Sequence, residues 1–460
     1  MYTEESHNLM ACHECDALIR KHALPAPATA HCPCCHATLY RNGPSTLGPV
    51  CAVTLAALIT FLIAQAFPIV ELETNGITTS TTLIGAILAL WGEQMQLVAV
   101  VVFCSTILFP VTELLALLYV TVPVRAGYVP SGFNQVLRII LAVRPWGMIE
   151  VFMLGVVVTL VKMTSVARVI PETALFAFGA LTIMFTAVVL FDPKVLWDIA
   201  GCLPAPRRYR RSTPGYHDSG QASSSGHAQP ARAVQNNTRT AVSASGATGS
   251  HCTTAWHAGL IACHACGQIE RCAFTVKTQH CSRCGALLHR RNPDSLARTW
   301  ALLVTAAGLY IPANILPVMH TSTLLGSQDD TILSGAALFW NAGDYPLAAI
   351  IFVASIMIPV LKLVSLAVLA YTTQTGSTWR LHERMTLYRI IEHVGRWSML
   401  DIFVITLTIA LVHFGSLAVI TAGPGALAFA SVVVLTMTAT MQFDPRLMWD
   451  HFRTSGQRHV

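Results

Sequence analysis

Long apolar runs dominate the pattern of hydrophobic and polar positions in this 460-residue chain. Each run is long enough to cross roughly 30 Å of hydrocarbon as a helix. Because backbone groups in lipid must be satisfied within the segment, such runs favour helices over open strands. The pattern therefore predicts an all-α polytopic membrane protein. The ranges expected to span the membrane are 48–70, 96–121, 147–167, 173–191, 299–318, 346–370, 398–417 and 424–443.

The same pattern occurs twice along the chain. "HCPCCHATLYRNGP" from His31 matches "HCSRCGALLHRRNP" from His280, and Pro110 aligns with Pro359 at the same offset. Further on, "RPWGMIEVF" (144–152) matches "GRWSMLDIF" (395–403), and "FDPKVLWD" (191–198) matches "FDPRLMWD" (443–450). An even number of spans in each copy leaves both copies in the same orientation. The sequence therefore predicts two parallel repeats of four transmembrane helices.

Four CxxC pairs precede the two sets of spans, two pairs ahead of each set. Two such pairs on short hairpins can close a tetrahedral site of four thiolates around one ion. In a reducing compartment thiols are metal ligands more often than disulfides. Cys34 offers an alternative register for the cysteine pairs, but the match between the two copies argues against that register. The pattern predicts two structural Zn²⁺ sites, with the ligands Cys12, Cys15, Cys32 and Cys35 in one and Cys263, Cys266, Cys281 and Cys284 in the other. Redox chemistry of the CxxC pairs is the competing interpretation.

Composition divides the chain into five segments. Between the two copies lies a stretch rich in Ser, Gly, Ala and Arg, too poor in apolar residues to pack a core, which is expected to be a flexible linker. The expected organisation is zinc ribbon 1 (1–46), transmembrane unit 1 (47–201), linker (202–257), zinc ribbon 2 (258–292) and transmembrane unit 2 (293–460).

Charge adds the orientation. The chain carries 29 Lys and Arg against 23 Asp and Glu, a formal net charge of +6. The basic residues gather before the first span, in the loops 122–146, 202–211 and 371–397, and after the last span, whereas the opposite loops are acidic. The positive-inside rule then places both termini and both zinc ribbons in the cytoplasm. Because topology accounts for the charge, we expect no nucleic-acid partner.

Lys362 lies inside an otherwise apolar span, where an ammonium costs at least about 2.5 kcal/mol. It lies above the cytoplasmic end of its span, at a depth that Asp401 in the next span can share. Ser355 and Lys362 are seven residues apart on one helical face, and Ser398 and Asp401 share a face of the following helix. With Thr436 in the last span, these residues are expected to form a polar cluster around an ion pair. Snorkelling of Lys362 to the headgroups, or an ion pair that serves stability alone, are the simpler interpretations.

The first repeat differs at these positions. Glu113 aligns with Lys362 and Glu150 with Asp401, so the expected pair is acid with acid. Lys162 and Asp192 are further candidates for a polar network there. This divergence places the expected working site in the second repeat. The chain has no GxxxxGK[ST], GxGxxG, HExxH or GxSxG motif, and the pattern favours no enzyme class.

Two CxxC…CxxC modules, each ahead of a four-span unit, and the "FDP…WD" span exits resemble the paraquat-inducible protein A family over nearly the whole chain outside the linker. The resemblance implies a non-enzymatic protein of the bacterial inner membrane that passes phospholipid to or from a periplasmic MCE-domain tunnel protein. It also implies that Ser355, Lys362, Ser398, Asp401 and Thr436 form the polar cluster of the family. The alternatives are a membrane thiol sensor and a proton-coupled exporter of small amphipathic compounds.

Overall fold

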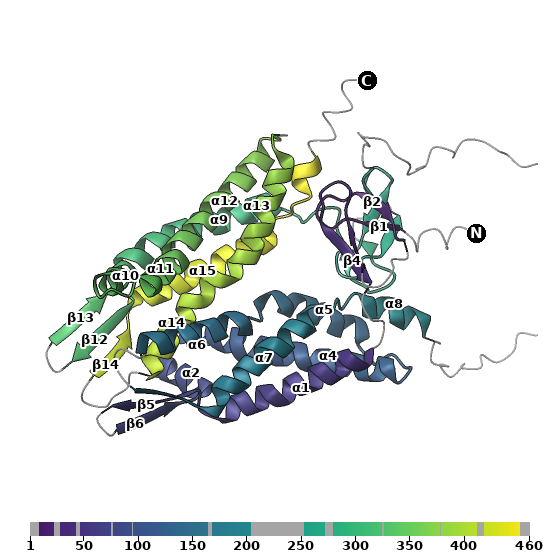
Figure 1. Cartoon of the computed structure of the whole chain (residues 1–460). Helices are drawn as coiled ribbons and strands as arrows, with labels where there is room; N and C mark the ends of the chain where they lie inside the picture. Colours follow the sequence, from purple (N-terminus) through teal and green to yellow (C-terminus); the bar gives the residue numbers. More distant parts are fainter. Residues whose placement is uncertain are drawn as a thin grey trace, which may run out of the picture. The chain divides into compact units, whose positions relative to one another are not determined.

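Helices form most of the described chain in the computed structural model (Figure 1). The predicted linker, 202–257, lies outside the described residues except at its two ends, and so do the last ten residues. The described residues are 9–22, 28–42, 47–74, 77–93, 95–163, 168–203, 253–271, 279–323, 326–377, 379–411 and 418–450.

The first repeat follows the predicted apolar runs and adds short helices between them. Its helices are α1 (Leu47–Ala66), α2 (Leu83–Gly92), α3 (Gln96–Phe103), α4 (Phe109–Arg125), α5 (Phe133–Val143), α6 (Ile149–Met163), α7 (Thr173–Val189) and α8 (Val195–Cys202). A π-helical turn, η2 (Cys104–Leu108), joins α3 to α4, and a 3-10 turn, η3 (Arg144–Trp146), precedes α6.

The second repeat has the same order of elements. Its helices are α9 (Ser295–Ile315), α10 (Ile332–Asn341), α11 (Tyr345–Phe352), α12 (Ile358–Gln374), α13 (Leu381–Val394), α14 (Leu400–Leu411) and α15 (Pro424–Gln442). The π-helical turn η4 (Val353–Met357) joins α11 to α12, and the 3-10 turn η5 (Gly395–Met399) precedes α14.

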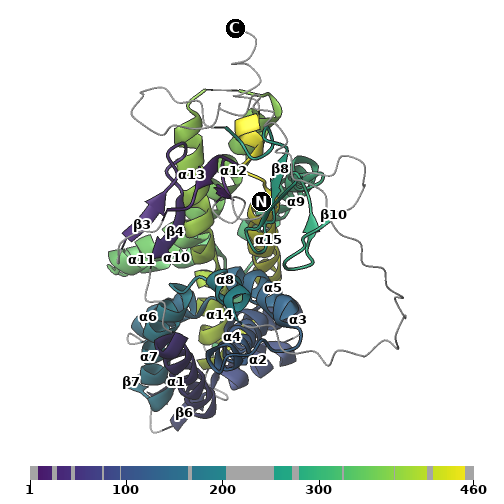
Figure 2. The same ribbon diagram turned by 90° about the vertical axis from the view of Figure 1, so that its right-hand side faces the viewer.

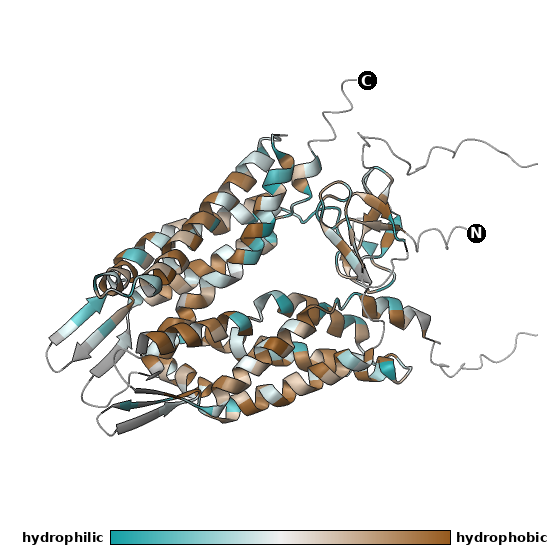
Figure 3. Cartoon of the chain, in the orientation of Figure 1, coloured by the Kyte–Doolittle hydropathy of each residue, from teal (hydrophilic) through white to brown (hydrophobic). Residues whose placement is uncertain are grey.

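Six helical stretches among the described residues are long and apolar enough to cross a membrane. Hydrophobic residues, brown in Figure 3, make up much of these stretches. Two predicted spans correspond to shorter helices, α7 with 17 residues and α14 with 12 described residues. The six stretches are Leu47–Ala66, Gln96–Arg125, Phe133–Val161, Ser295–Ile315, Ala348–Gln374 and Pro424–Gln442.

Two small antiparallel sheets correct the all-α prediction. In the first repeat β5 (Val70–Thr74) pairs with β6 (Ile77–Thr81) and with β7 (Arg168–Pro171). In the second repeat β12 (Met319–Thr323) pairs with β13 (Gly326–Asp330) and with β14 (Ala418–Ala422). The expected spans 48–70 and 299–318 therefore end earlier as helices, just ahead of Pro68 and Pro317, since a residue before proline is pushed towards extended backbone. Both sheets lie at the end of the helices opposite to the cysteine hairpins (Figure 1).

Two of the membrane spans, 96–121 and 346–370, contain an internal proline, and a π-helical turn precedes it in each. Pro110 and Pro359 lack a backbone N–H, and their rings crowd the carbonyls of Thr106 and Ser355 one turn earlier. The extra residue of a π turn is one way in which a helix accommodates such a break. The hydroxyl groups of Thr106 and Ser355 each donate to the carbonyl four residues before, at 2.7 Å.

The core joins the two repeats through α14. Phe403 of α14 packs edge-on against Phe152 of α6, with ring centroids 5.5 Å apart, and Phe152 packs in turn on Phe178 of α7. Gly155 makes this approach possible, because a Cβ there would lie 3.0 Å from the Cβ of Phe403. The described part of α14 therefore packs mainly on the first repeat, although the chain places it in the second.

Candidate functional site

Two buried clusters of four cysteines are formed by pairs of short hairpins. Module 1 consists of β1 (Leu9–Ala11), β2 (Leu18–Arg20), β3 (Ala28–His31) and β4 (Thr38–Asn42). Module 2 consists of β8 (Leu260–Ala262), β9 (Ile269–Arg271), β10 (Gln279–His280) and β11 (Leu287–Leu288). The ligand atoms of each cluster lie within 4.8 Å of one another, and the clusters are Cys12, Cys15, Cys32, Cys35 and Cys263, Cys266, Cys281, Cys284.

The turn that follows each CxxC pair has the same backbone. The residue after the second cysteine adopts a left-handed conformation in all four turns. In module 2 both of these residues are glycines, Gly267 and Gly285, whereas module 1 uses Asp16 and His36. The amide of each of these residues donates to the carbonyl of the first cysteine in its pair. This tight turn directs both thiols of a pair towards one point.

The donor set fits one tetrahedral metal ion in each module. Zinc–thiolate bonds of about 2.3 Å place neighbouring sulfurs about 3.8 Å apart in a tetrahedron. The closest pairs here are Cys12 with Cys35 at 3.5 Å and Cys15 with Cys32 at 3.6 Å. In module 2 the matching sulfur distances are both 3.5 Å. Cys34 is not part of the cluster. A metal bound by four thiolates would stabilise the hairpins and leave no open position for a reacting water.

Lys362 is buried in α12, with 3% of its surface exposed. Its ammonium donates to the carbonyl of Gly395 and to the hydroxyl of Thr436, both at 3.3 Å. Ser398 donates to the same carbonyl at 2.8 Å. The structure therefore brings Lys362 and Ser398 to one backbone oxygen at the start of η5, with Thr436 beside the ammonium. The ammonium does not reach outward between the helices.

For two of the predicted cluster residues no contact with Lys362 is described. Ser355 is buried, but its hydroxyl donates to Ile351 in its own helix. Asp401 lies in α14, and its side chain is outside the described residues, so its pairing with Lys362 stays a prediction.

Gly395 was missed by sequence reasoning. A Cβ at this position would lie 3.0 Å from Cε and 3.2 Å from Nζ of Lys362. The absence of a side chain therefore makes room for the lysine. The signal in the sequence was indirect, since the other repeat has Arg144 where this one has Gly395.

Arg144 was also missed as a site residue, and it changes the picture of the first repeat. Its Nε lies 3.2 Å from Oε1 of Glu113, which is fully buried. One of its terminal nitrogens donates to the carbonyls of Val188, Val189 and Phe191 at the end of α7. The expected acid–acid pair is therefore an incomplete description, because Glu113 has a cationic partner that sequence reasoning used only for orientation.

The other first-repeat candidates lie apart from this pair. Glu150 is exposed and accepts a hydrogen bond from Thr186 at 2.9 Å. Asp192 is exposed and accepts from the backbone amide of Lys194 at 3.0 Å. The side chain of Lys162 is outside the described residues.

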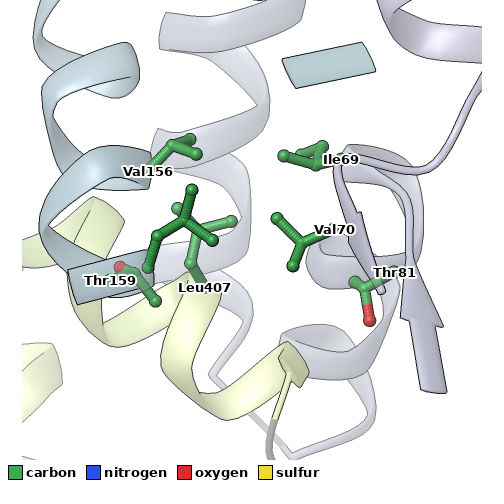
Figure 4. Close-up of a pocket in the computed structure, with 7 residues that line it drawn as sticks. Ile69, Val70, Thr81, Val156, Thr159 and Leu407 are labelled. Carbon is green, nitrogen blue, oxygen red and sulfur yellow. The ribbon is translucent and has the colours of Figure 1, made fainter. Parts of the chain in front are cut away.

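One small pocket lies where α6 and α14 meet the first sheet (Figure 4). Its lining is apolar except for Thr81 and Thr159, and it contains none of the predicted cluster residues. The lining residues are Ile69, Val70, Thr81, Val156, Thr159, Leu160 and Leu407.

The chain has membrane-length helices in two repeats, two four-cysteine clusters and a buried lysine. These features place it among integral membrane proteins. A family model described as paraquat-inducible protein A matches residues 47–200 and again 296–453, once for each repeat. The chain belongs to this family. No solved structure matches the chain.

Relatives match almost end to end. The chain is 34% identical over 445 residues to the intermembrane transport protein PqiA of Escherichia coli K12, covering 95% of each. It is 25% identical over 448 residues to the lipophilic envelope-spanning tunnel protein A of the same organism, covering 97% of this chain and 92% of the relative. A probable intermembrane transport protein of Haemophilus influenzae is 27% identical over 461 residues, covering 97% of each. All of these are named for transport or for a tunnel.

Proposed function

We propose that this protein moves phospholipid between the bacterial inner membrane and a periplasmic MCE-domain tunnel protein. The observation that carries the proposal is the buried Lys362, whose described partners are two neutral oxygens. A lysine ammonium has three donors, of which the described residues accept two, and cations within membrane spans pair with anions or with backbone carbonyls. The phosphate of a lipid headgroup is such an anion, and the carboxylate of Asp401 is the partner when no lipid is bound.

The names of the relatives support transport between membranes rather than an enzymatic reaction. A bilayer component of such a system must take the headgroup into a protein-lined site while the acyl chains stay in an apolar medium. A single cation surrounded by hydroxyl and carbonyl oxygens is suited to this task.

The distribution of basic residues supports an orientation in which both termini and both cysteine modules face the cytoplasm. The two sheets then face the periplasm, where an MCE tunnel would dock. In this arrangement α7 and α14 complete eight spans, four in each repeat.

Zinc is the metal we propose for both modules, as a structural ion in each of two zinc ribbons. Purified protein should contain about two equivalents of zinc. Metal-free protein with active CxxC disulfides would favour the redox alternative.

The test of the lipid site uses Lys362→Ala in full-length protein. We expect loss of complementation in cells that depend on this protein, with normal accumulation in the membrane, and loss of phospholipid that copurifies in mild detergent. Mass spectrometry of the extracted lipid measures the second effect. Thr305→Val is the matched control, because Thr305 is exposed on α9 and donates only to Ala301 in its own helix. Full complementation and unchanged lipid content in Lys362→Ala would refute the proposal.

A further inference from the structure

The residue inside one CxxC turn of module 1 contacts the second repeat. Glu14, between Cys12 and Cys15, accepts from Nε of Arg389 in α13 at 3.0 and 3.1 Å. Arg389 also donates to the carbonyl of Cys35 at 2.6 Å. One arginine of the second repeat therefore holds both cysteine turns of the first module.

Module 2 contacts the first repeat through its second CxxC turn. Arg283, between Cys281 and Cys284, donates to Asp198 of α8 at 2.8 Å. Its carbonyl accepts from the amide of Asn134 in α5 at 3.0 Å, and Asn134 is fixed by Trp197 of α8 at 2.9 Å. Burial raises the pKa of Asp198, but the hydrogen bond from Arg283 and the charge of Lys21 outweigh it, and the pKa is lowered overall.

Apolar packing follows the same crossed arrangement. Trp197, Leu196 and Leu137 of the first repeat share one buried cluster with the four cysteines and Leu288 of module 2. The chain order alone would place module 2 on the second repeat, which it directly precedes. Figure 2 shows β3, β4, β8 and β10 facing the viewer, with helices of both repeats behind them.

Module 1 also binds the segment that leads into module 2, and the end of module 2. The amide of Leu18 donates to Thr253 and the amide of Ala255 to Asp16, at 2.8 and 2.9 Å. Arg291, at the end of module 2, donates to Asp16 at 3.2 Å and to Asp450 after α15 at 2.6 Å. The modules thus form one body with contacts to both repeats.

We infer that the cysteine turns of each module form a metal-dependent clamp for the opposite repeat. Outside these turns each module also reaches its own repeat, through Lys21 with Asp198 at 3.1 Å and through Arg291 with Asp450 at 2.6 Å. The contacts of Glu14, Cys35 and Arg283 all come from turns whose shape depends on four thiols that meet at one point. Loss of the metal from module 1 is therefore expected to release α13. Loss from module 2 is expected to release α5, and to leave Asp198 of α8 with Lys21 alone. This inference concerns the assembly of the chain and does not require the proposed transport function.

The arrangement has a particular consequence for Lys362. Helix α13 runs directly into Gly395, whose carbonyl accepts from the lysine. Module 1 therefore fixes, through Arg389, the position of an oxygen in the buried site of the second repeat.

The first experiment measures cysteine protection separately in each module. Full-length protein in detergent is treated with a zinc chelator and N-ethylmaleimide, and labelling of each cysteine peptide is followed by mass spectrometry. Arg389→Ala should raise the labelling rate in module 1 roughly tenfold, since a hydrogen bond to a charged group contributes about 1.5 kcal/mol or more, and leave module 2 unchanged. Asn134→Ala should raise labelling in module 2 only. Glu383→Ala is the matched control in α13, since its described partner is Arg380 of the same segment.

A charge exchange keeps the test decisive if a single variant accumulates poorly. Glu14→Arg combined with Arg389→Glu should restore part of the protection of module 1 relative to either single change, because the ion pair forms again while the bond to the Cys35 carbonyl is lost. Equal labelling of both modules in Arg389→Ala, or no rescue by the exchange, would overturn crossed docking.

The second experiment alters a cysteine module and measures the effect on the repeat that it contacts. Cys32→Ser removes a ligand of module 1 and should expose the buried Arg384 of α13 to trypsin, while cleavage at Arg138 of α5 stays unchanged. Cys281→Ser should do the opposite. Cleavage sites are identified by mass spectrometry of the fragments. Cleavage in the repeat that follows the altered module along the chain would contradict the inference.

Discussion

The two repeats use aligned positions for charges of opposite sign. In the first repeat the long span carries Glu113, and the turn before the next span supplies Arg144. In the second repeat the long span carries Lys362, and the same turn supplies Gly395, whose carbonyl binds the lysine. The first pair is neutral overall and is locked to the end of α7 by three carbonyl bonds. In the second site the described partners of the ammonium are neutral oxygens, and we propose that it binds an anion.

This difference suggests that the two repeats have different tasks. A duplicated membrane unit can keep one copy as a rigid support and adapt the other for ligand binding. We propose that the buried polar groups, rather than the shared helices, decide which copy has which task. The predictions below test this contrast, from the largest expected effect to the smallest.

Arg144→Ala should destabilise the protein by about 3–5 kcal/mol, because it leaves Glu113 buried without its cation. It also removes the donor for three carbonyls of α7. Thermal unfolding in detergent measures the loss. Glu113→Gln should cost clearly less, since it keeps the carbonyl bonds of Arg144. Equal effects of the two changes would mean that Arg144 does not hold α7.

Gly395→Ala should impair the site of the second repeat by about 1–3 kcal/mol, because its methyl group would lie 3.0 Å from Cε of Lys362 and push the ammonium away from its partners. We expect reduced complementation with near-normal protein levels. Gly179→Ala in α7 is the control, since a Cβ there meets only a methionine methyl group at 3.9 Å. If Gly395→Ala leaves complementation unchanged, the function of the lysine does not depend on this close approach.

Thr436→Val removes a hydrogen bond to Lys362 and should cost about 1.5–3 kcal/mol, the range for a bond to a charged group. The measurements are lipid copurification and complementation. Thr440→Val, one turn later in the same helix, should leave both unchanged because the Thr440 hydroxyl donates only to the Thr436 carbonyl. A larger effect of Thr440→Val would point to helix packing as the cause.

Gly267→Ala should weaken module 2 by about 1–2 kcal/mol, since it forces a methyl group into the left-handed turn. His36→Gly should strengthen module 1 by a comparable or smaller amount, because it relieves the same strain. The rate of zinc release to a chromogenic chelator measures both. Release that is faster in His36→Gly would indicate that the histidine side chain is needed there, for instance beside His382, whose ring centroid lies 6.5 Å away.

The cysteine clusters and the long helices were predictable because each depends on local spacing. Two residues between cysteines indicate a metal site, and twenty apolar residues in a row indicate a long helix. Neither pattern depends on the rest of the fold. The sheets were not predicted, because "VELET" and "ITTST" are short and polar and become strands only when Arg168–Pro171 returns beside them.

The polar site was partly predictable for the same reason. Lys362 is conspicuous in an apolar run, and Thr436 lies at a plausible depth. The carbonyl of Gly395 has no side-chain signal, and Arg144 has the position of an ordinary orienting charge at a span end. The crossed docking of the modules depends on long-range contacts that no local pattern contains.

The π-helical turns ahead of Pro110 and Pro359 have a consequence for how these spans tolerate change. An α-helix advances by about 100° per residue, so one residue gained or lost within 353–357 would rotate everything after it by that angle. Lys362 would then turn away from its carbonyl and towards a different neighbour. The length of this segment therefore sets the rotational position of Lys362 about the helix axis. Single-residue insertions or deletions there should be far rarer in evolution than substitutions.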